Sequence, residues 1–526
     1  MNEKTTKAWR QYEAGCEYKR RIGLYETVRN NERFLRGDQW QGSDGELPKP
    51  VFNILRRIVD YMVCTVFSKK VTINFTDDDI PYTSDADKEN RLREAIDLLG
   101  KNASFRWERC KMDKVMRKAL YDAAISGDGV IYSYFDPDLP TAQPYKGDIV
   151  TENIDNVNLF VADVNRADIQ SQEYIILSGR QSVLSLRREA VKYGMTVSEA
   201  DRLIHSDDDT DIQSGDMARY ELDGDEEEKK ATYLIKFWRE NGKVCFEKSL
   251  KSCTLRRVKT NCRLYPVAYF NWYSTKNSFH GTSPISGLIP NQKFINRGYA
   301  MVMKHMTDTA FSKVIYDKSK IPEWTNAVGE AIAAVGTTNV SDAVSIIEPG
   351  KLEEGYMELL QNSIGMTKEM MGATEAALGN LNPTNTSAIL AIQEASKIPL
   401  MQIKDNLNAC AEDIANIWAD MMCAYYPAER LVPYYDAGKT NTSMIDFPLL
   451  CSALIQAHVE ISDPERFSIA YNQSVLDRLL DGGFITFTEY LERLPQGIVI
   501  DRDALIEKRK FQEILNLEEN YEREDN

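Results

Sequence analysis

The sequence carries little positive charge for its length. Its 526 residues include 64 Lys and Arg against 80 Asp and Glu, which gives a formal net charge of −16. A protein that holds nucleic acid firmly by neutralising phosphates shows the opposite balance. This composition excludes a repressor-like DNA binder, so any contact with DNA is expected to be local or transient.

Cysteine and histidine are too few and too scattered to predict a metal centre. None of the nine cysteines forms a C-x-x-C pair, and their odd number favours free thiols in a reducing compartment. The four histidines lack the spacing of metal ligands; they are His205, His280, His305 and His458. We therefore predict no metal and no cofactor.

Long apolar runs and catalytic signatures are missing as well. No stretch approaches the roughly 18 apolar residues of a membrane span, and the first residues lack the apolar core of a signal peptide. Gly438-Lys439-Thr440 looks like the end of a phosphate-binding loop, but Pro433 stands where that loop requires a glycine. No G-x-S-x-G elbow is present. We expect a soluble, intracellular protein that is not an enzyme, with no catalytic residue and no membrane partner.

The first half of the chain predicts a mixture of helices and strands. Helical periodicity marks residues 1–35, 51–67 and 86–126, and the last of these segments is expected to end at Gly127 and Gly129. The period-two alternation of Val71 to Phe75 predicts a strand, and short aromatic and β-branched runs between 130 and 270 predict further strands. The acidic stretch 206–228 does not match a calcium-binding loop and predicts a solvated surface loop.

The second half predicts long helices. We expect one helix from Pro290, as a first-turn residue, to about Ala310, and a second over 352–372. Short strands and a small helix around Trp324 to Val335 lie between them. A loop rich in Gly and Asn precedes a third and longest helix, which runs to about residue 425 and is kinked at Pro399. Together these elements predict an α+β fold that is mostly helical.

Apolar residues in the third helix recur at alternating spacings of three and four. This spacing is typical of a helix-packing seam. At about 38 residues the helix would be roughly 55 Å long, longer than a compact domain needs. We expect it either to cross between domains or to pack against neighbouring subunits. The seam comprises Leu400, Ile403, Leu407, Cys410, Ile414, Ile417 and Met421.

Three basic residues share one face of the first long helix. At about 100° per residue, Arg297 and Lys304 lie within roughly 40° of Lys293. This stripe has two interpretations. It is either the polar side of an amphipathic helix, which happens to be basic, or it belongs to a ring of such helices that presents circular bands of positive charge (basic belts) to the DNA backbone. The opposite face carries Ile295, Tyr299, Val302 and Met306. An acidic stripe on the second helix could pair with the basic one or keep a channel from holding DNA; it comprises Glu354, Glu358 and Glu369.

The order of these elements resembles that of phage portal proteins, most closely those of long-tailed phages of Gram-positive hosts. The shared order is a long helix, a compact insert, a second helix, an Asn- and Gly-rich loop and a long kinked helix. The local sequence is similar to that family at residues 34–40, 47–54, 372–380 and 385–388. The resemblance covers nearly the whole chain and is weakest in the last hundred residues.

The resemblance implies a portal architecture that assembles as a ring of about twelve subunits at one capsid vertex. It implies three DNA-channel candidates, Lys293, Arg297 and Lys304. The implied divisions are a wing at 1–282, a first stem helix at 283–310, a clip at 311–351, a second stem helix at 352–372, a tunnel loop at 373–387, a long kinked wing helix at 388–426, and a crown with a C-terminal tail at 427–526. The implied tunnel-loop candidates are Leu378, Gly379, Asn380, Asn382, Pro383 and Asn385.

The same resemblance implies the partners. They are further copies of the chain, double-stranded DNA that passes without sequence specificity, terminase, head-completion or connector proteins, and capsid or scaffolding proteins. The expected location is the virion, with assembly in the host cytoplasm. Two alternatives stay open. One is another phage head structural protein, and the other is a cytoplasmic metal-dependent hydrolase that uses the acidic stretch and scattered carboxylates.

Overall fold

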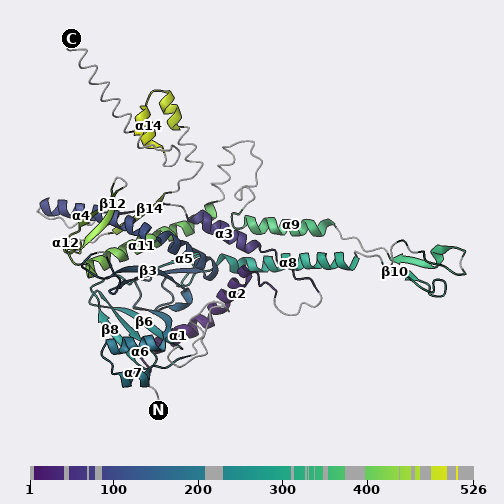
Figure 1. Cartoon of the computed structure of the whole chain (residues 1–526), viewed down its shortest axis with the longest axis horizontal. Helices are drawn as coiled ribbons and strands as arrows, with labels where there is room; N and C mark the ends of the chain where they lie inside the picture. The colour runs from purple at the N-terminus through teal and green to yellow at the C-terminus, as the bar shows by residue number, and fades with distance from the viewer. Residues whose placement is uncertain are drawn as a thin grey trace, which may run out of the picture.

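The computed structural model consists of a body and a projecting arm (Figure 1). The body contains most of the helices and the two larger sheets, and the arm is a pair of long helices with a small sheet at its tip. The structure describes residues 5–40, 47–67, 70–76, 86–141, 143–207, 229–309, 313–325, 329, 331–336, 338–347, 354–373, 397–436, 439–451, 456–462, 475–494 and 505–506.

The chain enters the body through two helices, α1 (Lys7–Arg21) and α2 (Leu24–Arg36). Thr6 caps α1, because its hydroxyl accepts a hydrogen bond from the amide of Trp9. Gly23 separates the helices with a φ of 70°, a left-handed conformation that glycine adopts without strain. Three further helices follow, interrupted by strand β1 (Lys70–Thr76): α3 (Ile54–Val66), α4 (Ala86–Arg109) and α5 (Met112–Ser126).

Two antiparallel sheets form the centre of the body. The first has the order β3-β2-β9, with β2 in the middle. The second has the order β4-β5-β6-β7-β8, in which each strand pairs with its neighbour in sequence. The strands are β2 (Asp128–Asp136), β3 (Asp148–Ile154), β4 (Leu159–Val161), β5 (Tyr174–Ser182), β6 (Lys230–Glu240), β7 (Lys243–Ser249), β8 (Thr254–Lys259) and β9 (Val267–Asn271). Helices α6 (Val183–Lys192) and α7 (Val197–Leu203) connect β5 to β6.

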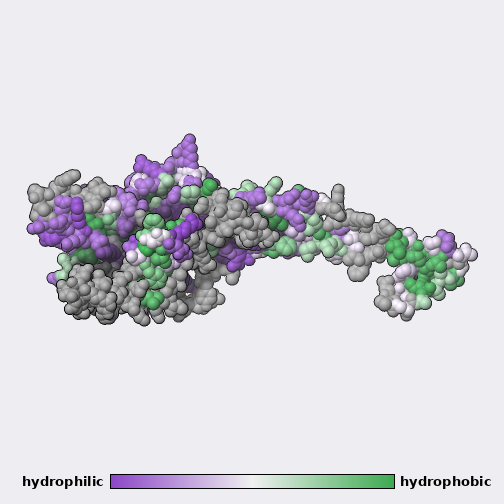
Figure 2. Space-filling model, turned by 90° about the horizontal axis from the view of Figure 1, so that it is seen from above, coloured by the Kyte–Doolittle hydropathy of each residue, from purple (hydrophilic) through white to green (hydrophobic). Residues whose placement is uncertain are grey.

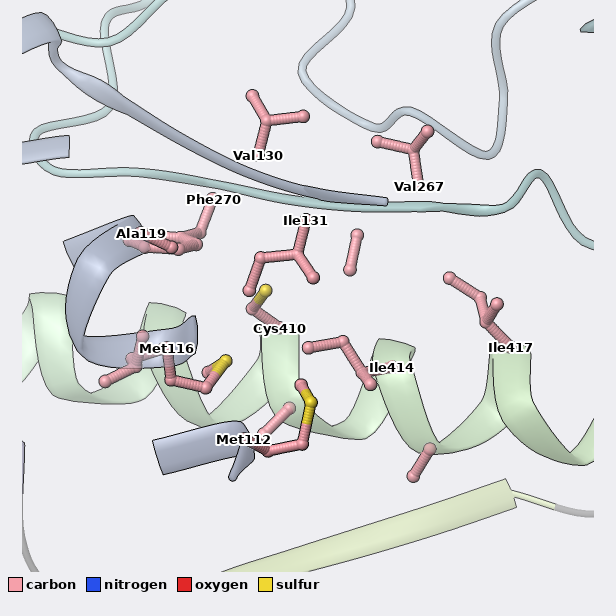
Figure 3. Close-up of a cluster of buried hydrophobic side chains, with 14 of the residues drawn as sticks. Met112, Met116, Ala119, Val130, Ile131, Val267, Phe270, Cys410, Ile414 and Ile417 are labelled. Atoms are coloured by element: carbon pink, nitrogen blue, oxygen red, sulfur yellow. The ribbon is translucent and has the colours of Figure 1, made fainter. Parts of the chain in front are cut away.

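The main core lies between the three-stranded sheet and α11 (Met401–Tyr425). Figure 3 shows Cys410 and Ile414 of α11 beside Ile131 of β2, with methionines of α5 closing the cluster. All seven residues of the expected seam are buried here. The seam therefore packs within its own chain, against two strands and α5.

A further group of described elements follows α11 in the chain. Strand β14 (Gln456–Ser462) pairs with β1, and β12 (Leu431–Asp436) pairs with β13 (Lys439–Met444). The short helix α12 (Phe447–Leu450) contacts both α4 and α11. Helix α14 (Phe487–Arg493) begins with a capping box formed by Thr486 and Glu489. The pairing of β1 with β14 joins residues that are almost four hundred positions apart in the sequence.

The arm consists of α8 (Pro284–Thr309), α9 (Glu354–Glu369) and, at the tip, β10 (Lys313–Tyr316) paired with β11 (Val344–Ile347). The start expected at Pro290 was wrong, because the helix begins at Pro284 and contains Pro290, which agrees with the range 283–310 that the resemblance implies for this helix. Ser283 starts it instead, since its hydroxyl accepts a hydrogen bond from the amide of Ile285.

Two further expectations concern the tip and the third helix. The helix expected around Trp324 to Val335 is wrong for the residues described there, 323–325 and 331–335, which are not helical. The amide of Val335 bonds instead to the carbonyl of Lys320, and Gly329 is left-handed. Pro399 lies in a short 3₁₀ turn, η3 (Ile398–Leu400), that runs directly into α11.

Replacing Leu407 tests the internal packing of α11. Leu407 is 1% exposed, so Leu407→Asp places a carboxylate without a partner in the core and removes the leucine contacts. We expect a loss of about 4 kcal/mol or more in the free energy of unfolding, measured by denaturant titration. The matched control is Ala409→Asp on the exposed side of the same helix, which should cost less than about 1 kcal/mol. Equal stability of the two variants would contradict this packing.

Candidate functional site

The two arm helices run side by side away from the body (Figure 1). Gly298 of α8 lies directly against Leu360 of α9, because a β-carbon added at Gly298 would lie 2.3 Å from a leucine methyl carbon. Nearer the body, the amide nitrogen of Asn291 lies 3.3 Å from the hydroxyl of Thr367. These two contacts define which residues of α8 and α9 lie at the same height along the arm.

Buried amides hold the base of α8 against the body. Gln292 and Asn296 are almost fully buried on α8 and bond to each other at 2.9 Å. Asn296 donates to the side-chain oxygen of Gln39 at 2.7 Å, and Gln292 donates to the carbonyl of Phe52 at 2.7 Å. Gln292 also accepts from the amide of Ile54 at 3.1 Å. Segments 34–40 and 47–54, which carried the sequence resemblance, therefore meet at the root of the arm.

A second buried polar cluster precedes α8 by a few residues. The carboxylate of Asp128 lies 2.7 Å from the imidazole of His280 and accepts from the amide of Gly281, also at 2.7 Å. Asn156 and Asn271 donate to the same carboxylate at 3.0 and 2.9 Å. Burial alone would raise the pKa of Asp128, but these partners, His280 first, hold the pKa below its ordinary value. The cluster fixes the turn from which the arm departs.

Lys19 of α1 lies next to this cluster and is itself buried. Its ammonium donates to the backbone carbonyls of Asn156, Val157 and Leu159 at 2.6 to 2.9 Å. It also lies 3.9 Å from the centre of the Phe160 ring. Burial lowers the pKa of Lys19 to about 7, against the opposing effect of nearby acidic groups.

The structure places the three DNA-channel candidates along one side of α8. Lys293 and Arg297 are exposed, and Lys304 lies 3.7 Å from Asp308 on the same helix. The ammonium of Lys293 lies 5.4 Å from the Phe34 ring and borders a surface hollow of about 540 Å³. The other residues that line the hollow all belong to α2 or to the turn before it: Gly23, Glu26, Thr27, Arg29, Asn30 and Arg33.

The opposite face of α8 is only partly the apolar face expected from the sequence. Ile295 and Val302 are buried, but Met306 is 61% exposed. Met306 belongs to the part of α8 that extends beyond the body, where fewer residues are available to cover it. The tunnel-loop candidates Leu378, Gly379, Asn380, Asn382, Pro383 and Asn385, and the start of the third helix, lie outside the described residues.

Large apolar side chains are exposed along the arm and gather at its tip. Figure 2 shows hydrophobic residues along the arm and a dense group at its end. At this end Ile315 and Ile346 each expose about three fifths of their surface on the small β10–β11 sheet. Exposure on this scale is typical of a surface that other protein covers.

The described residues offer no sign of metal chemistry or of a membrane span. No group of three or more His, Cys, Asp or Glu among them could hold a metal ion. Within the same ranges no helix is both long enough and apolar enough to cross a bilayer.

The comparisons with known proteins bear on the segment that contains the arm. The family model described as phage P22-like portal protein matches residues 221–445, which run from just before β6 to the end of β13. This match supports a phage portal protein. It thereby supports a phage head structural role and a location in the virion.

Other comparisons add less. No curated protein matches the chain. Among the solved structures that match the chain is a chain of the virion of a native gene transfer agent particle. It shares 9% identity and a TM-score of 0.38, over 89% of this chain and 93% of the other. Among these comparisons, only the family match supports a phage portal protein.

The low pKa of Lys19 predicts a dependence of stability on pH. Since the folded pKa of about 7 lies below the ordinary 10.5, the unfolded chain binds the extra proton between these values. The free energy of unfolding should therefore rise with pH across that window. Lys19→Met should remove about 4 kcal/mol of this rise between pH 7 and 10, measured by denaturant titration. Lys101→Met, at an exposed surface lysine, should leave the rise intact, and a rise that survives Lys19→Met would contradict the assignment.

Proposed function

We propose that the chain is the portal subunit of a tailed phage. About twelve copies form a ring at one capsid vertex, and double-stranded DNA passes through its channel during packaging, retention and ejection. The observation that carries the proposal is the family match, which spans the whole arm and the strands and helix on either side of it. The exposed apolar residues of the arm support assembly, because a lone subunit would leave them in water.

The parts of a portal then correspond to parts of this structure. We assign the arm helices α8 and α9 to the stem and the β10–β11 tip to the clip. Most of the body, residues 1–282 together with α11, is the wing, and the chain after residue 426 supplies the crown and tail. The tunnel loop at 373–387 stays a sequence-based proposal. The apolar tip supports a docking role, first for terminase and later for connector and tail proteins.

The mass of the particle tests assembly directly. A ring of about twelve copies of the 60.0 kDa chain has a mass near 720 kDa, and we expect this from native mass spectrometry together with a central hole in negative stain. A large particle without a hole would favour another head structural protein. A 60.0 kDa monomer that hydrolyses substrate in the presence of a divalent metal would favour the hydrolase.

Three neutral substitutions test the DNA-channel candidates. Lys293→Gln, Arg297→Gln and Lys304→Gln together remove the basic stripe, keep the apolar face and introduce no like-charge repulsion, so rings should still form. Basic belts contact phosphates regardless of base sequence, and their effect is screened by salt. We therefore expect filled heads with the triple variant to retain DNA with a different salt dependence from the wild type, whatever the DNA sequence.

The matched control replaces three exposed lysines of the body, Lys192, Lys243 and Lys259, by Gln. This control should package and retain DNA as the wild type does. If the stripe variant also behaves as the wild type at every salt concentration, the basic residues do not meet DNA.

A further inference from the structure

Each arm helix carries an exposed apolar pair beside a charged pair. On α8, Phe294 and Met301 are 48% and 45% exposed and lie beside the basic stripe. On α9, Leu359 and Met366 are 52% and 66% exposed. Two exposed acidic residues of α9, Glu358 and Glu369, flank the second pair. The arm thus carries a basic stripe on α8, an acidic stripe on α9 and an exposed apolar pair beside each stripe.

The spacings on the two faces are identical. Lys293 and Lys304 are eleven residues apart, as are Glu358 and Glu369. In a helix, eleven residues advance about 16 Å and turn the side chain back to within roughly 20°. The apolar pairs match as well, since Phe294 and Met301 are seven residues apart and so are Leu359 and Met366.

The heights of the residues along the arm also agree. Gly298 lies at the same height along the arm as Leu360, and Asn291 lies at the same height as Thr367. Each residue further along α8 therefore matches the height of one residue further back along α9. On this scale Glu358 lies four residues, about 6 Å, nearer the body than Lys304. Glu369 lies nearer the body than Lys293 by the same four residues.

One displacement therefore aligns both charge pairs. If a second arm is shifted about 6 Å toward the tip, its two glutamates become level with the two lysines. The same shift brings Leu359 and Met366 of the second arm within two residues, about 3 Å, of the levels of Met301 and Phe294. A modest inclination of the arms to a common axis produces a displacement of this size.

The rotational order fits a direct contact. Seen from Gly298 and Leu360, which face each other, both apolar pairs are turned in the same rotational sense. Because α8 and α9 run in opposite directions, the two apolar pairs point to one side of the arm. Glu358 and Glu369 lie roughly 160° to 180° from Leu360, so the acidic stripe is turned away from the chain's own α8. Gly298, which faces the chain's own α9, lies roughly 100° to 140° from the three basic residues, so the basic face is turned away from that helix.

We propose that the basic stripe of α8 docks on the acidic stripe of α9 in a second copy of this chain, with the apolar pairs of both arms side by side on one flank of the contact. This inference rests on the proposed ring and names the surfaces that join it. The contact is heterologous, since each copy offers a different face to each of its two neighbours, and such contacts form a ring when the rotation between copies closes. Lys293 and Lys304 then lie at the interfaces between subunits, beside the carboxylates of the next copy.

Charge reversal tests the contact. The first variant combines Lys293→Glu with Lys304→Glu, and the second combines Glu358→Lys with Glu369→Lys. Each variant alone places like charges across every interface, which disfavours association. We expect the fraction of chains in rings, measured by light scattering and native mass spectrometry at low salt, to fall at least tenfold for each variant. An equimolar mixture of the two should regain rings, because each variant then meets a neighbour of opposite charge.

The mixture separates this contact from one within a chain. Charges that paired α8 with its own α9 would be restored only by placing both reversals in one chain, and mixing would have no effect. The matched control, Lys243→Glu with Lys259→Glu on exposed positions of β7 and β8, carries the same charge change and should form rings normally.

Each outcome has a distinct meaning. A wild-type chain that never forms rings overturns the proposed function. Rings in the wild type and equally in both reversal variants overturn this contact alone. Failure of the mixture to regain rings also overturns it, provided that circular dichroism shows both variants to be folded.

Discussion

Two helices packed on each other cannot bury all of their apolar surface, and the arm is subject to this constraint. The contact through Gly298 and Leu360 covers one side of each helix, while Met303, Met306 and Met366 stay exposed. Each exposed side chain of this size forgoes about 1.5 to 3 kcal/mol that burial would provide. The arm therefore presents a surface of the kind that association with other protein covers.

The body meets a different demand, because it must hold the arm in one direction. Apolar packing is not directional, whereas a buried amide or carboxylate has to meet its partners at defined angles. The root of the arm is accordingly polar, with Gln292 and Asn296 on one side and Asp128 with His280 on the other. Gly127 shows how closely the backbones approach there, since a β-carbon at this residue would lie 2.6 Å from the carbonyl oxygen of Gly281. An arm held in this way keeps its direction while its surface is still uncovered.

Local patterns were enough to predict much of the body. The three-four spacing of the third helix identified residues that prove to be buried, and Gly127 was correctly placed at the end of a helical segment. These features depend on neighbours in sequence. The alternation of β1 likewise predicted a strand, although its partner β14 lies almost four hundred residues away and could not be inferred.

The root of the arm was not predictable for the same reason. Gln292 and Asn296 look like ordinary polar residues of a surface helix, and Lys19 like one more cation in a charged helix. Each is buried because a distant segment supplies its hydrogen-bond partners. The start of α8 was missed because Pro290 resembles a first-turn residue, whereas the cap at Ser283 acts through one side-chain hydrogen bond.

The excess of acidic over basic residues in the chain is consistent with subunit interfaces at which carboxylates neutralise the basic stripe. Every unpaired cation on a channel wall adds a salt-dependent attraction for phosphate. In the proposed ring of about twelve copies, three such residues in each copy would together slow the movement of DNA. A lysine beside a neighbour's glutamate retains its charge, but its field beyond roughly 8 Å is weakened by the opposite charge and by salt. In the proposed ring, pairing across subunits would let the same residues join the subunits and would weaken, without removing, their attraction for passing DNA. The net charge of −16 fits this arrangement, because it disfavours tight binding of DNA elsewhere on the chain.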